Sequence, residues 1–367
     1  MNRPSRPLLC RSPLRPGESL PSLLIRLAQE NFYHSPTMVA QLCRECLTRR
    51  DQVTHPTQTE TFHVLSELVQ IEADELYAAS VQRFAPAINP PTYEQRSIPL
   101  PSGKTVPVLP VFFSRVQTWP ESNVQFCPLC LQESAHHRVD WLPLAVAVCL
   151  RHQCLLVRGC SRCQEQLKIQ DVLETRCPNC GFELTQAPII SVAADQFGLF
   201  SQSVIQSWLS LSPPTSVNIE ASLPDEPPAT LYRLLDGLRR TVMCVRHHWD
   251  YLYDAPSGVG LPLFPCTSKR DMTPAKAYIL YATAFRGVVD WPRGFYDFLD
   301  AYKRRDGQTP RGHVQRDLGC IYTVWLKKLW GHPAFRFVQE AFDRYLSDEH
   351  SSTFALVRLR RLQNDPA

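Results

Sequence analysis

Closely spaced cysteines between residues 127 and 180 constrain the fold of this chain more than any other feature. Eight of its fourteen cysteines lie there, mostly in pairs separated by two positions, and His152 follows Cys149 at a similar spacing. Two ligands separated by two residues can reach one tetrahedral Zn²⁺ ion from a tight turn, and four ligands saturate the ion. The spacing therefore predicts two structural zinc sites, with Cys127, Cys130, Cys149 and His152 in the first and Cys160, Cys163, Cys177 and Cys180 in the second.

Other uses of cysteine fit this segment less well. Disulfides persist mainly in oxidising compartments, and the chain opens without the pattern of a cleavable signal peptide, so we expect a reducing compartment. A redox-active CxxC pair would stand alone in a thioredoxin-like context. A catalytic zinc keeps one position open, whereas both predicted sites have four protein ligands. The zinc deaminase signature needs an H-x-E sequence, which this chain lacks.

The spacing leaves one ligand of the first site open. Cys154 lies two residues after His152 and could replace it as the fourth ligand. We predict that His152 is the ligand and that Cys154 is a small buried side chain, because cysteines outside metal sites are commonly buried.

Length and composition describe a globular protein of two or three domains. The chain has 367 residues, of which 44% are hydrophobic and 20% are charged. Its apolar runs, such as residues 142–150, are too short to cross a membrane. We therefore expect a soluble, cytoplasmic protein with no membrane partner.

Helical periodicity predicts a helical N-terminal domain over residues 1–84. The expected helices cover residues 20–31, 36–47, 59–70 and 72–82, and Ser19 and Ser35 are suitable N-caps for the first two. This pattern is compatible with a helix-turn-helix unit and equally with another small helical bundle. Cys43 and Cys46 have metal-ligand spacing but no partner pair nearby, so we predict that they are core thiols.

The remainder of the chain divides into a zinc-binding part and a helical C-terminal part. Residues 85–190 hold a proline-rich lead-in and the tandem zinc ribbons or fingers, residues 191–209 a helix, residues 210–230 a linker, and residues 231–367 a helical domain. The expected C-terminal helices cover residues 230–253, 273–288, 291–304, 313–330 and 332–347. The predicted fold class is mainly α with small zinc-binding modules.

Charge is spread unevenly along the chain. Residues 1–60 and 231–367 carry net charges of +3 and +7, and the residues between them carry −6. Basic ends around an acidic middle suit a protein whose ends contact nucleic acid, and they also fall within ordinary surface variation. The best candidates for phosphate contacts are Lys303, Arg304, Arg305, Arg358, Arg360 and Arg361, each of which could equally belong to a solvated charged face.

Three segments resemble the TniQ/TnsD family of transposition proteins. The first is PGESLPSLLIRLAQENFY at residues 16–33. The second contains FCPLC, LPLAVAVCLRHQCLL, CSRC and CPNCG within residues 126–181, and the third is LGCIYTVWLKKLWGHPAFRFVQEAFDRYL at residues 318–346. In this family the eight predicted ligands match the positions that hold two structural zinc ions.

This resemblance implies a non-enzymatic selector of target sites for a bacterial DNA transposon. Family members combine a helix-turn-helix-like N-terminal part, two zinc modules and a helical C-terminal part. They recruit an AAA+ ATPase regulator of the TnsC type to the chosen DNA, and that regulator brings in the transposase. Some members read an attachment site directly, and others dock on an RNA-guided CRISPR effector such as Cascade. The chain is shorter than the longest direct readers, which favours the adaptor role of a CRISPR-associated TniQ, as a monomer or a homodimer.

Two rival function classes make different demands on the sequence. A zinc-containing transcription regulator would use the same modules but would bind a promoter without any ATPase. A zinc-dependent nuclease or deaminase would need an open metal site beside acidic or basic catalytic residues, which we do not find. Glycine-rich phosphate loops are also absent, so we do not expect nucleotide hydrolysis.

Overall fold

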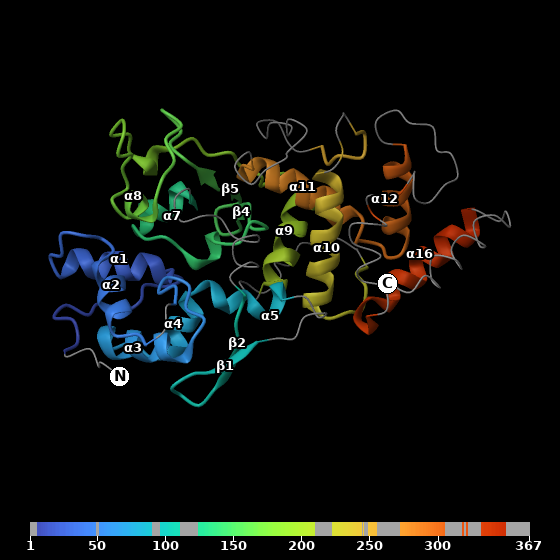
Figure 1. The fold of residues 1–367 in the computed structure, drawn as a ribbon. Coiled ribbons are helices and arrows are strands. Elements are labelled where there is room, and N and C mark those ends of the chain that lie inside the picture. The colour runs from blue at the N-terminus through green and yellow to red at the C-terminus, as the bar shows by residue number, and fades with distance from the viewer. Residues whose placement is uncertain are drawn as a thin grey trace. The chain divides into compact units, whose positions relative to one another are not determined.

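The fold is mainly helical in the part of the chain that the structure describes, which confirms the predicted class. The computed structural model describes residues 6–48, 51–89, 96–110, 124–209, 222–243, 245, 249–254, 272–304, 318, 321 and 332–349. Within these ranges the named strands form three two-stranded antiparallel sheets, and every other regular element is a helix (Figure 1). None of the described helices is both long enough and apolar enough to span a membrane.

Contacts divide the chain into two compact units. The first unit comprises Met1–Asn89, Glu94–Ser216 and Thr273–Tyr278, and the second comprises Pro90–Tyr93, Val217–Met272 and Ile279–Ala367. The first unit therefore contains both the N-terminal helices and the cysteine-rich segment.

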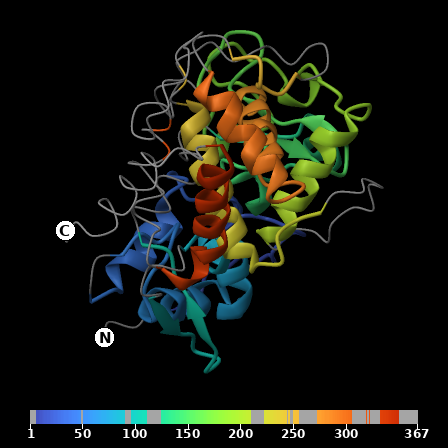
Figure 2. The same cartoon turned by 90° about the vertical axis from the view of Figure 1, so that its right-hand side faces the viewer.

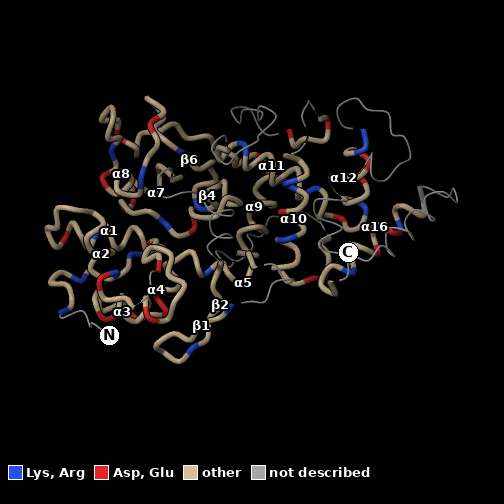
Figure 3. Tube along the Cα trace, viewed as in Figure 1, with Lys and Arg blue, Asp and Glu red and all other residues tan. Residues whose placement is uncertain are grey.

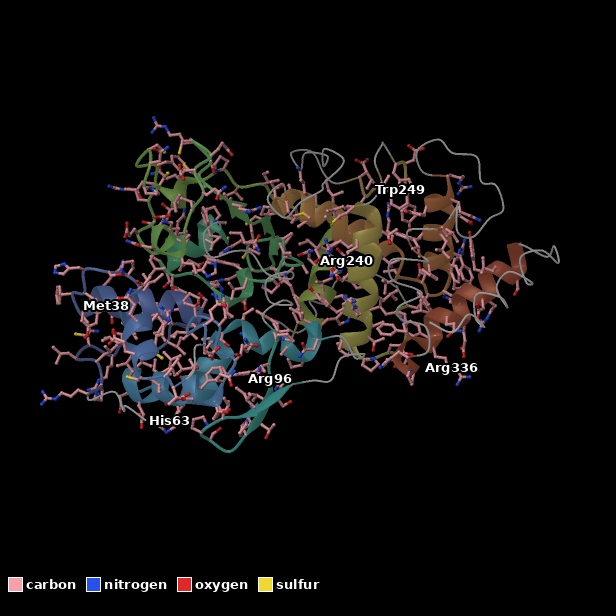
Figure 4. The ribbon with its side chains drawn as sticks, in the orientation of Figure 1. Met38, His63, Arg96, Arg240, Trp249 and Arg336 are labelled. Atoms are coloured by element: carbon pink, nitrogen blue, oxygen red, sulfur yellow. The ribbon has the colours of Figure 1, made fainter. Side chains whose placement is uncertain are left out.

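Four helices of the first unit form where periodicity predicts them. They are α1 (Leu20–Glu30), α2 (Met38–Glu45), α3 (Thr59–Val69) and α4 (Ala73–Ala79), followed by the short η1 (Val81–Phe84) and α5 (Ala85–Ile88). Each helix buries one apolar face, and together these faces form a core that includes Leu23, Leu27, Phe62 and Leu65. In Figure 4 Met38 marks the start of α2 and His63 lies on α3.

The helix starts follow the predicted caps only in part. Ser19 caps α1 as predicted, because its hydroxyl accepts a hydrogen bond from the backbone N–H of Ser22 at 3.4 Å. The prediction that Ser35 caps α2 is wrong. The Ser35 hydroxyl accepts instead from the N–H of Thr37, so α2 begins only at Met38 and Pro36 precedes it. The lead-in at residues 85–120 also contains a hairpin, β1 (Ser97–Pro99) with β2 (Thr105–Pro107), in which Ile98 opposes Val106.

The cysteine-rich segment is built from very short elements. In chain order they are β3 (Gln125–Phe126), α7 (Pro128–Glu133), η2 (Val139–Trp141), β4 (Val148–Cys149), β5 (Cys154–Leu155), β6 (Val157–Arg158), α8 (Ile169–Leu173), η3 (Leu184–Gln186) and the longer α9 (Gln196–Trp208). Strand β3 pairs with β6, and β4 pairs with β5. Elements this short form few internal hydrogen bonds, so their geometry depends on packing, and a bound metal would stabilise it further.

The entrance to α1 is attached to the cysteine-rich segment by hydrogen bonds. The N–H of Ser19 donates to the carbonyl of His137 at 2.8 Å, and the N–H of Val139 donates to the carbonyl of Gly17 at 2.9 Å. The Ser19 hydroxyl lies 3.0 Å from Nδ1 of His137. These contacts join segments more than a hundred residues apart in the sequence.

A buried ion pair fixes the same entrance. Glu18 and Arg26 are 2% and 5% exposed, and two guanidinium nitrogens of Arg26 donate to the two carboxylate oxygens of Glu18 at 2.8 and 3.0 Å. Ser22 also donates to Glu18, and Arg26 donates to the carbonyl of Pro13. The opposite charges and their hydrogen bonds offset the free-energy cost of removing both groups from water. Either group buried without its partner would leave that cost uncompensated.

The second unit is helical, as predicted. Its helices include α10 (Pro228–Met243), the later part of α11 (Pro274–Arg286), α12 (Arg293–Lys303), η6 (Pro333–Phe335) and α16 (Arg336–Glu349), coloured yellow to red in Figure 2. Trp249 packs edge-to-face on Phe298 and Tyr302 and donates to the carbonyl of Ala301. Helix α10 ends at Met243, ten residues before its predicted end, and the helix predicted at 313–330 lies outside the described residues except for 318 and 321.

One buried carboxylate of α10 forms ion pairs with three arginines of the same helix. Asp236 is 1% exposed and forms ion pairs with Arg239 at 2.7 Å, Arg240 at 2.9 Å and Arg233 at 3.6 Å. All three arginines lie within one turn of Asp236 on the same helix, and Arg240 is labelled in Figure 4.

Candidate metal centres

The first predicted site is assembled from one helix start and one hairpin. Cys127 precedes the first turn of α7 and Cys130 lies within it, so both sulfurs lie at the start of this helix. Cys149 ends β4, and His152 lies in the turn that leads to β5. The four predicted ligands come together, with all ligand atoms within 4.8 Å of one another.

The distances in this group fit a tetrahedral zinc ion. Ligand bonds of about 2.3 Å to sulfur and 2.0 Å to nitrogen imply separations of roughly 3.8 Å between sulfurs and 3.5 Å between sulfur and nitrogen. The sulfurs of Cys130 and Cys149 are 3.7 Å apart. Nδ1 of His152 lies 3.4, 3.3 and 3.5 Å from the sulfurs of Cys127, Cys130 and Cys149. A bound ion would link the start of α7 to the hairpin, with no ligand position left for a substrate.

A carboxylate orients the histidine of this site. Nε2 of His152 lies 3.2 Å from the Glu133 carboxylate, which can only accept, and Nδ1 is directed at the three sulfurs. Arg151 binds the other carboxylate oxygen of Glu133 at 2.7 Å. A carboxylate behind a ligating histidine fixes the ring and strengthens it as a ligand. Sequence spacing does not identify Glu133, because it is not itself a ligand.

Cys154 lies beside the first site but outside the group of four. Its side chain is fully buried, and its sulfur is 3.7 Å from that of Cys127. The hydrogen bond to Cys127 and burial raise the pKa of Cys154, so this thiol stays protonated and can donate to the Cys127 sulfur. The geometry therefore groups His152, and not Cys154, with the other three predicted ligands.

The second predicted site joins two similar turns. Cys160 and Cys163 follow β6, and Cys177 and Cys180 follow α8. The sulfurs of Cys160 and Cys180 are 3.7 Å apart, and those of Cys163 and Cys177 are 3.6 Å apart, again near the tetrahedral value. A hydrogen bond from the backbone N–H of Glu165 lowers the pKa of Cys163 to about 7, which favours the thiolate that a metal requires.

Three of the ligand pairs share one backbone feature. The residue after the second ligand has a positive φ: +47° at Gln153, +62° at Gln164 and +68° at Gly181. Gln164 and Gly181 each donate their N–H to the carbonyl of the first cysteine of their pair. This turn directs both side chains of a pair toward one point, and a glycine adopts it without steric cost.

The other sequence candidates lie elsewhere. Cys43 is fully buried in the N-terminal core and Cys46 packs against it, which confirms that they are core thiols. Among the described residues, the two cysteine-rich groups are the only ones suited to a metal ion.

The residues predicted to contact phosphate differ in their exposure. Lys303 is 8% exposed, lies 3.1 Å from Asp300 and stacks over the Tyr345 ring, so its charge already has partners. Arg304 is exposed at the end of α12. Arg305, Arg358, Arg360 and Arg361 lie outside the described residues. Basic and acidic positions are interspersed along the described helices of each unit (Figure 3), and the nucleic-acid role of these residues stays a prediction.

The N-terminal helices and the first candidate metal centre lie together in the part of the chain that matches a known family model. Residues 9–156 match the family model of TniQ. These residues extend from just before α1 through all four ligands of the first site to β5. The match covers less than half of the chain, which is therefore similar to TniQ over this region. Comparison with the curated proteins gave no match.

Proposed function

We propose that this protein is a non-enzymatic adaptor for target selection in transposition. It would link target DNA, or an RNA-guided CRISPR effector bound to it, to an AAA+ ATPase that regulates the transposase. The proposal rests on the TniQ match over residues 9–156. The protein would bind two structural zinc ions, one at each predicted site.

The geometry of the metal centres supports a scaffold role. Each group offers four protein ligands around one point, so a bound zinc would be fully coordinated and would stabilise the fold. The first centre is also bonded to the entrance of α1 through residues 137 and 139. A rigid first unit can hold one binding surface at a fixed distance from another.

A pull-down with the purified AAA+ ATPase, with and without target DNA or the effector complex, tests this proposal. We expect the zinc-loaded protein to retain the ATPase and to increase its recruitment to the chosen DNA. Failure to bind the ATPase under any of these conditions would refute the adaptor role. Specific promoter binding without the ATPase would instead indicate a transcription regulator, and specific binding to an attachment site without an effector would indicate a direct reader.

A further inference from the structure

The end of α1 places an aromatic side chain in solvent at a cost in backbone strain. Phe32 has φ +57° and is 89% exposed. Its N–H donates to the carbonyl of Gln29, and the N–H of Tyr33 donates to the carbonyl of Ala28. This is the Schellman arrangement that ends many helices, and its left-handed position usually holds glycine. Because the Phe32 ring is exposed, it contributes no hydrophobic stabilisation that would offset this strain. A role outside the folding of the chain would explain why a phenylalanine stands at this position.

A second exposed apolar side chain lies on the neighbouring segment. Leu9 is 90% exposed, although Leu8 beside it is buried in the core and donates its N–H to Leu68. Asn31 accepts a hydrogen bond from the N–H of Cys10 and donates one to the carbonyl of Cys10, at 2.9 and 2.8 Å. These bonds hold together the residues next to Leu9 and Phe32, whose side chains are both exposed.

This pair is unusual within the described chain. Among the large hydrophobic side chains of the described residues, only Leu9, Phe32 and Ile189 are exposed, and Ile189 is only 45% exposed. Exposed apolar groups that gather on a fixed surface mark interaction sites more often than isolated ones do. Fixed aromatic side chains are also frequent anchors of protein interfaces.

The charges near this pair indicate the kind of partner. Arg6 and Arg11 flank Leu9, are exposed, and form no ion pair with any residue that the structure describes. Two copies of this surface would bring like charges together, which disfavours self-association. Phe32 offers a ring on which a base could stack, but the aliphatic Leu9 does not. Protein–nucleic acid interfaces are more polar than protein–protein interfaces, so an exposed leucine beside the ring favours a protein partner.

We propose that Leu9 and Phe32 anchor a protein partner whose surface has an apolar recess edged by acidic residues. The inference rests on the proposed function, in which that partner is the AAA+ ATPase. Arg6 and Arg11 orient the partner, and the two apolar side chains supply most of the affinity. Two side chains bury little area, so the contact is a transient one.

The substitution Phe32→Gly separates binding from stability. Glycine relieves the strain at this position, so the melting temperature should rise while binding of the ATPase weakens by about tenfold or more. Leu9→Ser should weaken binding in the same direction. Gln70→Gly is the matched control, because Gln70 is exposed at the end of α3 with φ +56°. This control should raise the melting temperature without changing binding.

Binding is measured with full-length, zinc-loaded protein on a sensor surface, with the purified ATPase and ATP in solution. Unchanged ATPase binding in both Phe32→Gly and Leu9→Ser would overturn the inference, as would an equal loss in Gln70→Gly. A second arm uses duplex and single-stranded DNA without the ATPase, and a loss confined to that arm would make the surface a nucleic-acid contact. The binding of the unmodified protein to the ATPase is measured first. If that binding is absent, the proposed function fails, and this outcome is distinct from a failure of the inference about Leu9 and Phe32.

Discussion

Glu133 determines which ring nitrogen of His152 faces the sulfurs of the first metal centre. Its carboxylate accepts the Nε2 proton and is itself held by Arg151. Loss of such a carboxylate commonly costs about 10- to 100-fold in metal affinity. We expect Glu133→Ala to weaken zinc binding by that factor at one of the two sites, as measured by competition with a chromophoric chelator.

The control for this substitution lies near the second predicted site. Glu174 is also an exposed carboxylate at the end of a short helix, and it accepts a hydrogen bond from Gln170. Glu174→Ala should leave both zinc affinities unchanged. Equal affinities in Glu133→Ala and the unmodified protein would show that the carboxylate does not support the site.

Zinc content distinguishes His152 from Cys154 as the fourth ligand. We expect two zinc ions per chain in the unmodified protein and in Cys154→Ser, because the Cys154 sulfur is outside the group of four. His152→Ala and Cys177→Ser should each reduce the content to one, since each removes a ligand from a different site. Elemental analysis of dialysed protein measures this, and loss of one zinc in Cys154→Ser would reverse the assignment.

Spacing predicts ligands better than it predicts their surroundings. Pairs such as Cys160 and Cys163 are recognisable because a metal requires a tight turn with two donors. Glu133 and Phe32 are not recognisable in this way. Glu133 depends on a contact across 19 positions, and the exposure of Phe32 depends on where the chain before α1 passes.

At the scale of single elements, α10 is stabilised by one carboxylate that compensates three arginines. Removing one partner of a buried pair leaves the other charge uncompensated, at a cost of about 3–5 kcal/mol. We therefore expect Asp236→Asn to lower the free energy of unfolding of the second unit by that amount in denaturant titrations. Glu340→Gln is the control, because its pair with Arg336 is largely exposed and such pairs contribute about 0–1 kcal/mol.

The contribution of Asp236 should depend on pH. Burial raises the pKa of Asp236, but Arg239, Arg240 and Arg233 outweigh it and lower the pKa to about 2. In an unfolded chain an aspartate has a pKa of about 3.9, so the stabilisation from this shift, roughly 2–3 kcal/mol, is present above that pH and is lost as pH falls toward 2. The difference in unfolding free energy between the unmodified protein and Asp236→Asn should therefore shrink from pH 4 to pH 2. A constant difference over this range would show that Asp236 is not ionised in the folded state.

Periodicity predicts the longer elements of this fold and misses the short ones. Helices such as α1 and α3 repeat an apolar face over three turns, which the sequence displays directly. Strands of two residues, such as β3 and β6, are too short for any alternation, and their pairing depends on contacts between distant segments. The start of α2 differs from prediction because the Ser35 hydroxyl bonds to a turn instead of to a helix N-terminus.

At the scale of the first unit, metal removal should affect α1 as well as the metal centres. Gly17 and Ser19 are bonded to residues of the segment between Cys130 and Cys149, which a bound zinc would hold in place. After zinc is removed with a chelator, we expect faster hydrogen exchange in residues 127–180 and in α1 together. Helices α10 and α12 belong to the second unit and should keep their exchange rates. Unchanged exchange in α1 would show that it folds without the metal centre.

The bond between Ser19 and His137 also sets an order of events during synthesis. The two residues are 118 positions apart. Ribosomes add about 5–20 residues per second, so the start of α1 emerges roughly 6–24 s before its partner segment exists. Throughout that interval Glu18 lacks the backbone of Arg138, beside which it lies in the folded chain. The earliest helix to be made is therefore among the last whose contacts are completed, because its entrance waits for the segment that contains His137.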